Sequence, residues 1–342
     1  MERGITQNLM LQVSYVGSES YHLSAAMNRN FAGSRVCADA AGCLSGGNRA
    51  RNQAVVVPQG TTYVPWTGQR ANPFVGSALG WYFVGTSSYH SANVSLVKRA
   101  RAGLTFKTNY TFAKVLDIHS ATATVTAQNQ PSTVLNPFNL KLNRGLAAFS
   151  LKHQFNTNFS YELPFGRGRR YGSGAGGWVE KLIGSWQWNG IVSAQSGFPI
   201  TPQVGSNASG TGDTQNPDVP NRNPAFQGKV ILGADGFRKT GLYFDPNAFS
   251  MPLAGTFGNS GRGSFRGPRL FNVDTSLFKK FTLNEKWSLQ FRAEVFNLFN
   301  HANFDTPNPA VFSGNNVSPS AGIITETAGT SRQVQFALKL LF

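Results

Sequence analysis

The sequence predicts an all-β protein, namely an antiparallel transmembrane β-barrel fold with about eight long strands. Three observations predict it. Apolar and polar residues alternate over eight segments of roughly ten residues, about the length that a tilted strand needs to cross a bilayer. The connections between these segments are either short or very long. Gly (37) and Phe (27) are abundant among 342 residues, and only 13% are charged, a mix typical of strands joined by glycine-rich loops.

The first four strands are expected in residues 7–17, 88–98, 103–114 and 153–163. In each segment, apolar side chains occupy one face and mainly Ser, Thr, Asn or Gln occupy the other. In the third, Phe106 and Tyr110 alternate with Asn109 and Thr111. This period of two is typical of a strand with one apolar and one polar side.

The last four strands are expected in residues 186–195, 270–278, 287–295 and 332–342, and they show the same alternation. The chain ends on an apolar stripe made of Val334, Phe336, Leu338, Leu340 and Phe342. An open terminal strand with an aromatic end can be recognised by barrel assembly machinery, whereas an exposed edge elsewhere is an aggregation hazard. We therefore expect this stripe to be a C-terminal assembly signal.

The connections alternate in a way that indicates orientation. Residues 99–102 and 282–286 are short turns, and residues 164–184 join strands four and five with room for one short helix. The other connections, about 17–86, 117–148, 197–269 and 300–331, are very long. Short periplasmic turns and long extracellular loops are typical of outer-membrane barrels.

Lipid outside and water inside give each strand two different faces. The expected lipid-facing residues include Phe106, Phe159, Val192, Phe291 and Leu338, and the expected lumen-facing residues include Asn109, Asn158, Asn189, Arg292 and Gln335. Trp186, Phe281, Trp287 and Phe342 lie next to short turns or the terminus, where a periplasmic aromatic girdle belongs. Asp274, Arg292 and Glu294 are expected to point into the barrel. They are either charges of the wall in contact with water or contacts to a plug, that is, a separate domain that fills the barrel.

The formal net charge of +16 arises from scarce acidic residues (15) rather than from excess base (31). A basic chain suggests nucleic-acid binding. Here, however, the basic residues cluster at "KRAR" (98–101), "GRGRR" (166–170) and "KK" (279–280). We interpret them as charged turns that flank hairpins, and no nucleic-acid partner is expected.

The two cysteines, Cys37 and Cys43, lie in the polar stretch "VCADAAGC". A close pair with no other cysteine in the chain predicts a small disulfide formed in an oxidising compartment. The alternative is half a zinc site, but no further Cys or nearby His completes it.

No motif supports an enzyme or a cofactor. "GSGAGG" (172–177) matches the dinucleotide pattern, but no apolar strand precedes it and no acidic residue follows about 20 positions later. The five histidines lack metal-binding spacing, and G-x-S-x-G is absent. Asp213, Asn216 and Asp218 could surround calcium, although a turn-rich loop is the simpler interpretation. No run of 18 apolar residues predicts a transmembrane helix, and the N-terminus does not look like a signal peptide.

Several stretches resemble, in order, the C-terminal barrel of Oar-like TonB-dependent receptors, which are outer-membrane transporters. They are "SYVGSESYHL", "YTFAKVLD", "YELPFGRGRR", "SGFPITP", "GSFRGPRLFNVDTSLFKKFTL", "LQFRAEVFNLFNHANF" and "RQVQFALKLLF". The resemblance covers nearly the whole chain. It implies a location in the cell outer membrane, a barrel of about 22 strands filled by an N-terminal plug, and uptake of an unidentified substrate.

Only eight strands are expected here, and neither a plug nor a TonB-contacting segment is found. Residues 1–342 are therefore expected to be the C-terminal part of such a barrel. The expected partners are outer-membrane lipid, barrel assembly machinery, the missing N-terminal strands and plug, and TonB only through that plug. The alternatives are an autonomous small outer-membrane barrel with a structural or adhesive role, and a soluble basic β-protein that binds nucleic acid.

Overall fold

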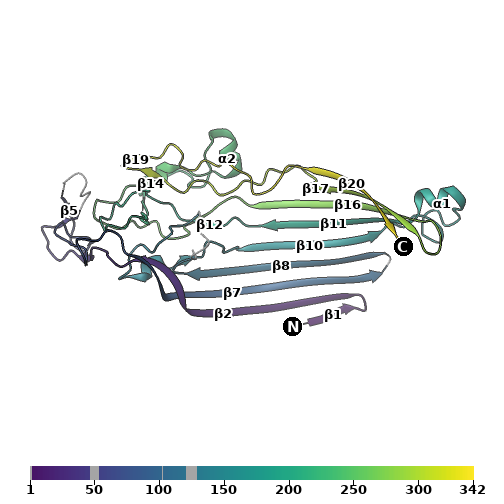
Figure 1. Ribbon diagram of the computed structural model, residues 1–342, viewed down its shortest axis with the longest axis horizontal. Coiled ribbons are helices and arrows are strands. Elements are labelled where there is room, and N and C mark those ends of the chain that lie inside the picture. The colour runs from purple at the N-terminus through teal and green to yellow at the C-terminus, as the bar shows by residue number, and fades with distance from the viewer. Residues whose placement is uncertain (1, 47–53, 102, 121–128) are drawn as a thin grey trace.

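The computed structural model describes residues 2–46, 54–101, 103–120 and 129–342. Its main feature is one antiparallel sheet, and each of the eight expected segments forms a strand of it (Figure 1). These long strands are β2 (Leu9–Asn28), β7 (Leu79–Arg101), β8 (Leu104–Asp117), β10 (His153–Glu162), β11 (Trp186–Gln195), β16 (Leu270–Thr282), β17 (Ser288–Phe296) and β20 (Gln333–Leu341). Each pairs with the next along the chain, and the sheet stays open at both sides.

One strand was not expected. A five-residue strand, β1 (Glu2–Thr6), folds back on β2 through a tight turn at residues 7–8, and Glu2 pairs with Gln12. The first expected strand, whose partner was expected among the missing N-terminal strands, is therefore already paired at residues 9–12, where β1 covers its edge. The segment "ERGIT" is too short, and too interrupted by glycine, to show a clear alternation.

The first long connection is shorter than expected. Strand β2 continues past residue 17 to Asn28, and β7 begins at Leu79, before the expected start at residue 88. The pairing shifts between Ser20 and Leu23 and again between Leu23 and Ser24. His22 has a positive φ of 56° at this irregularity. Such a bulge breaks the period of two, so the alternation fades while the strand continues.

Lys279 also differs from expectation, because it lies within β16 rather than in a turn. Only 2% of it is exposed, and its ammonium donates to the carbonyl oxygen of Gly184. The rings of Trp186 and Phe281 lie 5.3 and 5.2 Å from its Nζ. This lysine on the apolar face thus lies between two aromatic rings and donates to one carbonyl.

The short turns and the C-terminus gather at one end of the strands, at the right in Figure 1. The expected short helix is present there as α1 (Gly177–Ile183) in the β10–β11 connection. The four girdle aromatics lie at this same end, where the rings of Trp287 and Phe342 are 5.3 Å apart.

The long connections gather at the other end and form a folded loop assembly with its own core (Figure 1). The largest buried cluster there includes Ile200, Val204, Phe244, Phe265 and Val311. The assembly contains β3 (Arg35–Val36), β4 (Cys43–Ser45), β5 (Val55–Val57), β6 (Thr62–Tyr63), η2 (Leu140–Asn143), β9 (Gly145–Leu146), β12 (Pro199–Ile200), β13 (Asn221–Arg222), α2 (Gly233–Thr240), η3 (Pro246–Ala248), β14 (Phe249–Ser250), β15 (Phe265–Arg266), β18 (Phe312–Ser313) and β19 (Asn316–Val317). None of the helices in the described part of the chain is long and apolar enough to cross a membrane.

Candidate functional site

The register of the sheet places the apolar stripes of all eight long strands on one face. Directly paired residues project to the same side of a sheet. Phe159 pairs with Phe106, Val192 with Val273, and Phe291 with Leu338. The residues expected to face the lumen, Asn109, Asn158, Asn189, Arg292 and Gln335, all fall on the opposite face. The two expected sets are therefore separated as the sequence predicts.

Polar groups on the apolar face are paired with one another. The hydroxyls of Thr108 and Thr157 lie 2.7 Å apart across β8 and β10. The indole Nε1 of Trp188 donates to Thr275 Oγ1 at 2.7 Å, and this hydroxyl donates to the carbonyl of Asn189 at 3.0 Å. Such pairing is required where no water is present to satisfy a polar group. These contacts fit a surface that faces lipid.

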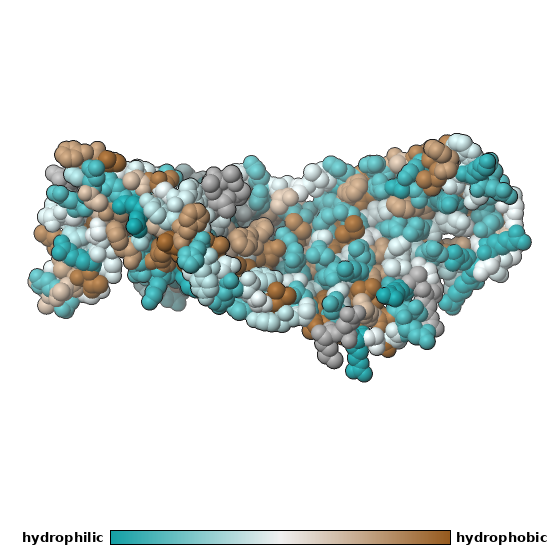
Figure 2. Space-filling model, turned by 60° about the horizontal axis from the view of Figure 1, so that its bottom comes forward, coloured by the Kyte–Doolittle hydropathy of each residue, from teal (hydrophilic) through white to brown (hydrophobic). Residues whose placement is uncertain are grey.

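The opposite face carries mainly small polar side chains, with a few larger ones such as Ile191 and Phe278 among them. Thr111 Oγ1 donates to Asn93 Oδ1 at 2.8 Å, and Asn93 Nδ2 donates to Ser91 Oγ at 3.1 Å. Gln187 Nε2 donates to Ser160 Oγ at 2.5 Å. With the β1–β2 side turned forward in Figure 2, hydrophilic and neutral residues cover most of the strand part of the molecule, at the right. A hydrogen-bonding layer of this kind suits a wall in contact with water.

Three charged residues of this face, Asp274, Arg292 and Glu294, lie on the neighbouring strands β16 and β17. Asp274 and Glu294 line a cavity of about 210 Å³ together with Asn158, Asn189 and Ser276. Asp274 Oδ1 accepts from the backbone N–H of Asn297 at 2.8 Å. Nearby, Arg292 donates to Gln290 Oε1 and stacks over the ring of Phe278, 4.7 Å from its centroid. These side chains can therefore offer both acceptors and a cation to whatever occupies the lumen.

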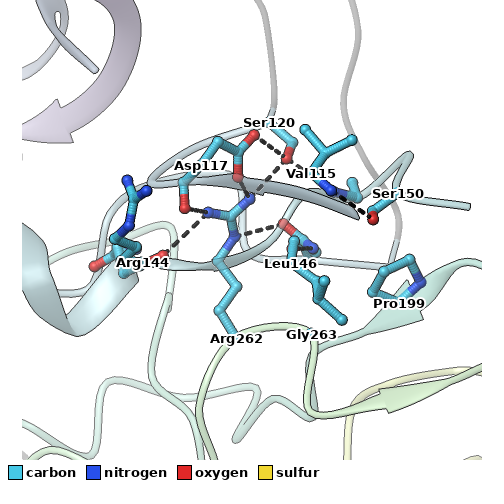
Figure 3. Close-up of polar contacts among 12 residues, drawn as sticks. Val115, Asp117, Ser120, Arg144, Leu146, Ser150, Pro199, Arg262 and Gly263 are labelled. Carbon is cyan, nitrogen blue, oxygen red and sulfur yellow. Dashed lines mark hydrogen bonds and ion pairs between the residues drawn. The ribbon is translucent and has the colours of Figure 1, made fainter. Parts of the chain in front are cut away.

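Arg262 joins two long loops at the end of this face (Figure 3). Its guanidinium pairs with the carboxylate of Asp117 at the end of β8, and both side chains are almost fully buried. It also donates to Ser120 Oγ at 2.7 Å, to Gln130 Oε1 at 2.6 Å and to the carbonyl of Asn143 at 3.0 Å. Burial lowers the pKa of Arg262, and Asp117 opposes that shift. A buried charge with this many partners holds the 197–269 connection against the 117–148 connection.

Glycines allow this approach. A Cβ added at Gly145 would lie 2.5 Å from the carbonyl oxygen of Arg262, and one at Gly197 would lie 1.9 Å from that of Gly267. Pro199 pairs with Arg266, so "SGFPITP" contacts "GSFRGPRL" directly. Arg266 also donates to the carbonyl of Ser150 at 2.7 Å.

Neither Arg262 nor Arg266 belongs to a motif that predicts a functional residue. The signal that could have found them is the alternation of Arg and Gly in "GRGSFRG" (261–267), because glycine permits close backbone approach.

Asp213 and Asp218, considered above as calcium ligands with Asn216, are both buried in a turn-rich loop. Asp218 accepts from Ser209 N–H and Oγ, each at 2.8 Å, and Asp213 accepts from Gln215 N–H at 2.8 Å. Burial raises the pKa of both carboxyls, that of Asp218 to about 6. Among the described residues, no group of three or more His, Cys, Asp or Glu has the arrangement of a metal site.

Cys37 and Cys43 form a disulfide, with their Cα atoms 5.7 Å apart. Cys37 packs with Val57 and Tyr63 in a small buried cluster of the first long loop. The disulfide therefore lies in the loop assembly, at the opposite end of the strands from the short turns (Figure 1).

The C-terminal strand β20 pairs only with β17 and forms one side of the open sheet. Its apolar side chains are exposed, with 69% of Phe336, 68% of Leu338 and 93% of Phe342 accessible. An exposed apolar stripe at a sheet edge is what a lipid-facing strand presents before the next strand is added.

A comparison with protein-family models agrees with this description. Residues 1–335 match the model of a family described as "Outer membrane beta barrel domain". Among solved structures, the outer membrane transporter YddB from Escherichia coli is similar, with 10% sequence identity and a TM-score of 0.44. The match covers 99% of this chain and 31% of the transporter, so this chain spans about a third of that protein's length. Among curated proteins, none shows significant sequence similarity. Because the family model covers nearly all of its residues, this chain belongs to the outer membrane beta barrel domain family and is located in the outer membrane.

Proposed function

We propose that this chain forms the C-terminal part of the barrel wall of an Oar-like, TonB-dependent receptor that takes up a substrate across the outer membrane. The observation that carries the proposal is the mainly polar face that extends across eight long strands of an open sheet. β1 and β20 are each paired on one side only, so further strands are needed to complete a wall.

The chemistry of the polar face favours a wide barrel over a small autonomous one. A closed barrel of eight strands has an interior only wide enough for side chains. Ser91, Asn93, Asn158 and Ser160 would make a poor dry core, because many of their donors and acceptors would lose water without gaining partners. The same residues suit a wide lumen that holds water and a plug.

The proposed partners follow from the two faces and the two edges. Outer-membrane lipid contacts the apolar face, and a plug contacts Asp274, Arg292 and Glu294 on the polar face. The missing N-terminal strands pair with the uncovered part of β2 and with β20. TonB acts only through the plug, and barrel assembly machinery recognises the stripe from Val334 to Phe342.

Site-specific crosslinking tests this function in the product of a reading frame extended upstream of Met1. A cysteine at Glu294 on the polar face should form disulfides with cysteines placed in the plug, whereas one at Phe291 on the apolar face should not. Uptake by cells should also stop when the plug segment that contacts TonB is deleted. Crosslinks confined to this chain, with uptake that does not depend on TonB, would favour the autonomous barrel instead.

A further inference from the structure

A large cavity opens on the apolar face of the sheet, not in the proposed lumen. Its volume is about 760 Å³. Its floor includes His153, Phe155, Ala194 and Phe271, which the register places on the same face as the lipid-facing set. Its roof comes from residues 231–243, including the start of α2, and from residues 301–304. These elements lie at the loop end of the strands, near the start of β16 (Figure 1).

The position of the cavity along the strands matches one boundary of a membrane. Phe271 is at its floor, and Phe281 is part of the aromatic group at the short-turn end, 10 positions later in β16. Ten residues of strand span about 33 Å, or about 25 Å across a bilayer at a tilt of about 40°. Because an apolar band about 25 Å tall is typical of such barrels, the cavity lies at the level of the outer lipid headgroups.

The cavity combines positive charge with aromatic surface. Arg269 is exposed and forms no ion pair with any other described residue. Arg238 stacks over the ring of Phe304, 5.8 Å from its centroid, and is 3.3 Å from Asp235. Asp235 is the acidic partner of Arg238. Because 89% of the Asp235 side chain is exposed to solvent, this ion pair is weak. Both guanidinium groups can therefore turn toward an anion.

His153 and His301 add ring nitrogens to the same cavity. His153 Nδ1 is hydrogen-bonded to the Tyr110 hydroxyl at 2.7 Å, and His301 Nδ1 lies 3.2 Å from Asn303 Oδ1. These contacts orient both imidazole rings through Nδ1. Neither contact uses the Nε2 atom of the ring. Below the floor, the wall continues as Val192, Val273 and Leu277, all apolar.

We propose that this cavity binds the phosphate-bearing headgroup of an outer-leaflet lipid, whose acyl chains then lie along the apolar wall below it. Arg238 and Arg269 bind the phosphate oxygens, because the planar guanidinium donates two parallel hydrogen bonds to such a group. Phe271 and Phe304 contact the linking part of the headgroup. The floor strands β10, β11 and β16 lie away from both open edges, so the site depends on the outer-membrane location and not on the transport function.

Native mass spectrometry of the protein extracted from outer membranes tests this site with three probes. They are phosphatidic acid, a diacylglycerol with the same acyl chains, and inorganic phosphate. Phosphatidic acid should bind more tightly than either of the others. The double variant Arg238→Gln/Arg269→Gln should lose affinity for phosphatidic acid by about tenfold for each arginine, with no change for diacylglycerol.

The control variant is Arg35→Gln/Arg222→Gln, which removes two exposed loop arginines that do not line the cavity. It should bind all three probes as the parent does. Should the double variant fold poorly, the single variant Arg269→Gln replaces it, because this side chain is exposed. Equal affinity for phosphatidic acid and diacylglycerol would overturn the proposal, and so would unchanged binding by the arginine variants. Displacement of phosphatidic acid by an equal concentration of inorganic phosphate would overturn the lipid assignment in favour of a free anion.

Discussion

Asp218 and Arg262 are both buried charged residues of the loop assembly, but they are stabilised differently. Arg262 pairs with Asp117, and its other donors reach Ser120, Gln130 and Asn143. Asp218 forms no ion pair with another described residue and relies on the N–H and hydroxyl of Ser209. A paired charge makes a loop depend on its partner, whereas an unpaired carboxyl makes it depend on pH.

We predict that the loop around Asp218 is more stable at acidic pH. Burial raises the pKa of this carboxyl from 3.8 to about 6, so between these values the folded state binds a proton that the unfolded state has lost. The free energy of unfolding should be highest below pH 3.8 and fall by up to about 3 kcal/mol as the pH rises through 6. Hydrogen exchange of residues 205–220, corrected for intrinsic rates, measures this dependence.

The variant Asp218→Asn should remove most of this dependence, because an amide does not titrate. A smaller dependence should remain, since burial also raises the pKa of the neighbouring Asp213. Equal protection from hydrogen exchange at pH 4 and pH 7 in the parent protein would contradict a raised pKa of the buried Asp218 carboxyl.

We predict that Arg262→Ala loosens the contact between the 117–148 and 197–269 connections. The substitution leaves the buried carboxylate of Asp117 without its cation, which typically costs about 3–5 kcal/mol. Limited proteolysis should then cut these loops faster in the variant. Arg170→Ala, which removes an exposed arginine at the short-turn end, should change the rate little, since exposed substitutions usually stay within about 0.5 kcal/mol. Equal cleavage rates in both variants would contradict the role of Arg262.

At the level of the elements, the strands could be predicted because the alternation of side chains is a local property. The expected and observed bounds of β11 coincide at 186–195. The alternation did not predict strand residues where it is interrupted or too short. These places are the bulge near His22 and the five-residue strand β1. The contact between Asp117 and Arg262 joins residues 145 positions apart, and no local pattern encodes such a pairing.

The two faces of the sheet give a labelling prediction. Single cysteines at Asn109, Asn158 and Asn189 should react with a membrane-impermeant thiol reagent in intact outer membranes, because these positions meet water. Cysteines at Phe106, Phe159 and Val192 should react slowly, because these positions meet lipid. Cys37 and Cys43 are joined to each other and add no background. Similar reaction rates for the two sets would contradict this assignment of faces.

An arginine scan provides an independent measure of the same faces. Arg at Phe159, in the middle of β10, should cost about 2–4 kcal/mol and lower the amount of folded protein in the membrane. Arg at Asn158, its immediate neighbour on the polar face, should be tolerated. Heat-modifiable migration on gels reports the folded fraction, and an equal loss in both variants would argue against a lipid-facing Phe159.

The last strand carries the prediction about assembly. Deleting Phe342, or replacing it with Asp, should reduce insertion of the proposed full-length receptor into the outer membrane, because the terminal aromatic belongs to the proposed recognition stripe. Leu341→Asn, on the opposite face of β20, is the matched control and should insert normally. Normal membrane levels and normal heat-modifiable migration of the Phe342 variants would refute the assembly signal.

At the level of the whole molecule, the fold combines a loop assembly that has its own buried core with a sheet that is open at both sides. The largest buried apolar cluster lies among the long connections, not between the sheet and a second layer. The sheet has one apolar face exposed, one polar face exposed and two open sides. Lipid can cover the first face, but in the proposed receptor only a plug, water and further strands complete the rest.

We therefore predict that this chain alone transports nothing. Refolded in detergent, it should aggregate or stay sensitive to protease, because the uncovered stretch of β2 and the outer edge of β20 offer unpaired backbone groups to other copies. Liposomes that contain it should show no selective uptake, since an incomplete wall encloses no pathway and no plug couples it to an energy source. Adding the proposed upstream strands and plug on the same polypeptide should restore a monodisperse, protease-resistant and heat-modifiable species. A monodisperse, protease-resistant monomer of the isolated chain that imports or conducts a solute would instead establish an autonomous barrel, and the polar face would then have to fill its own interior.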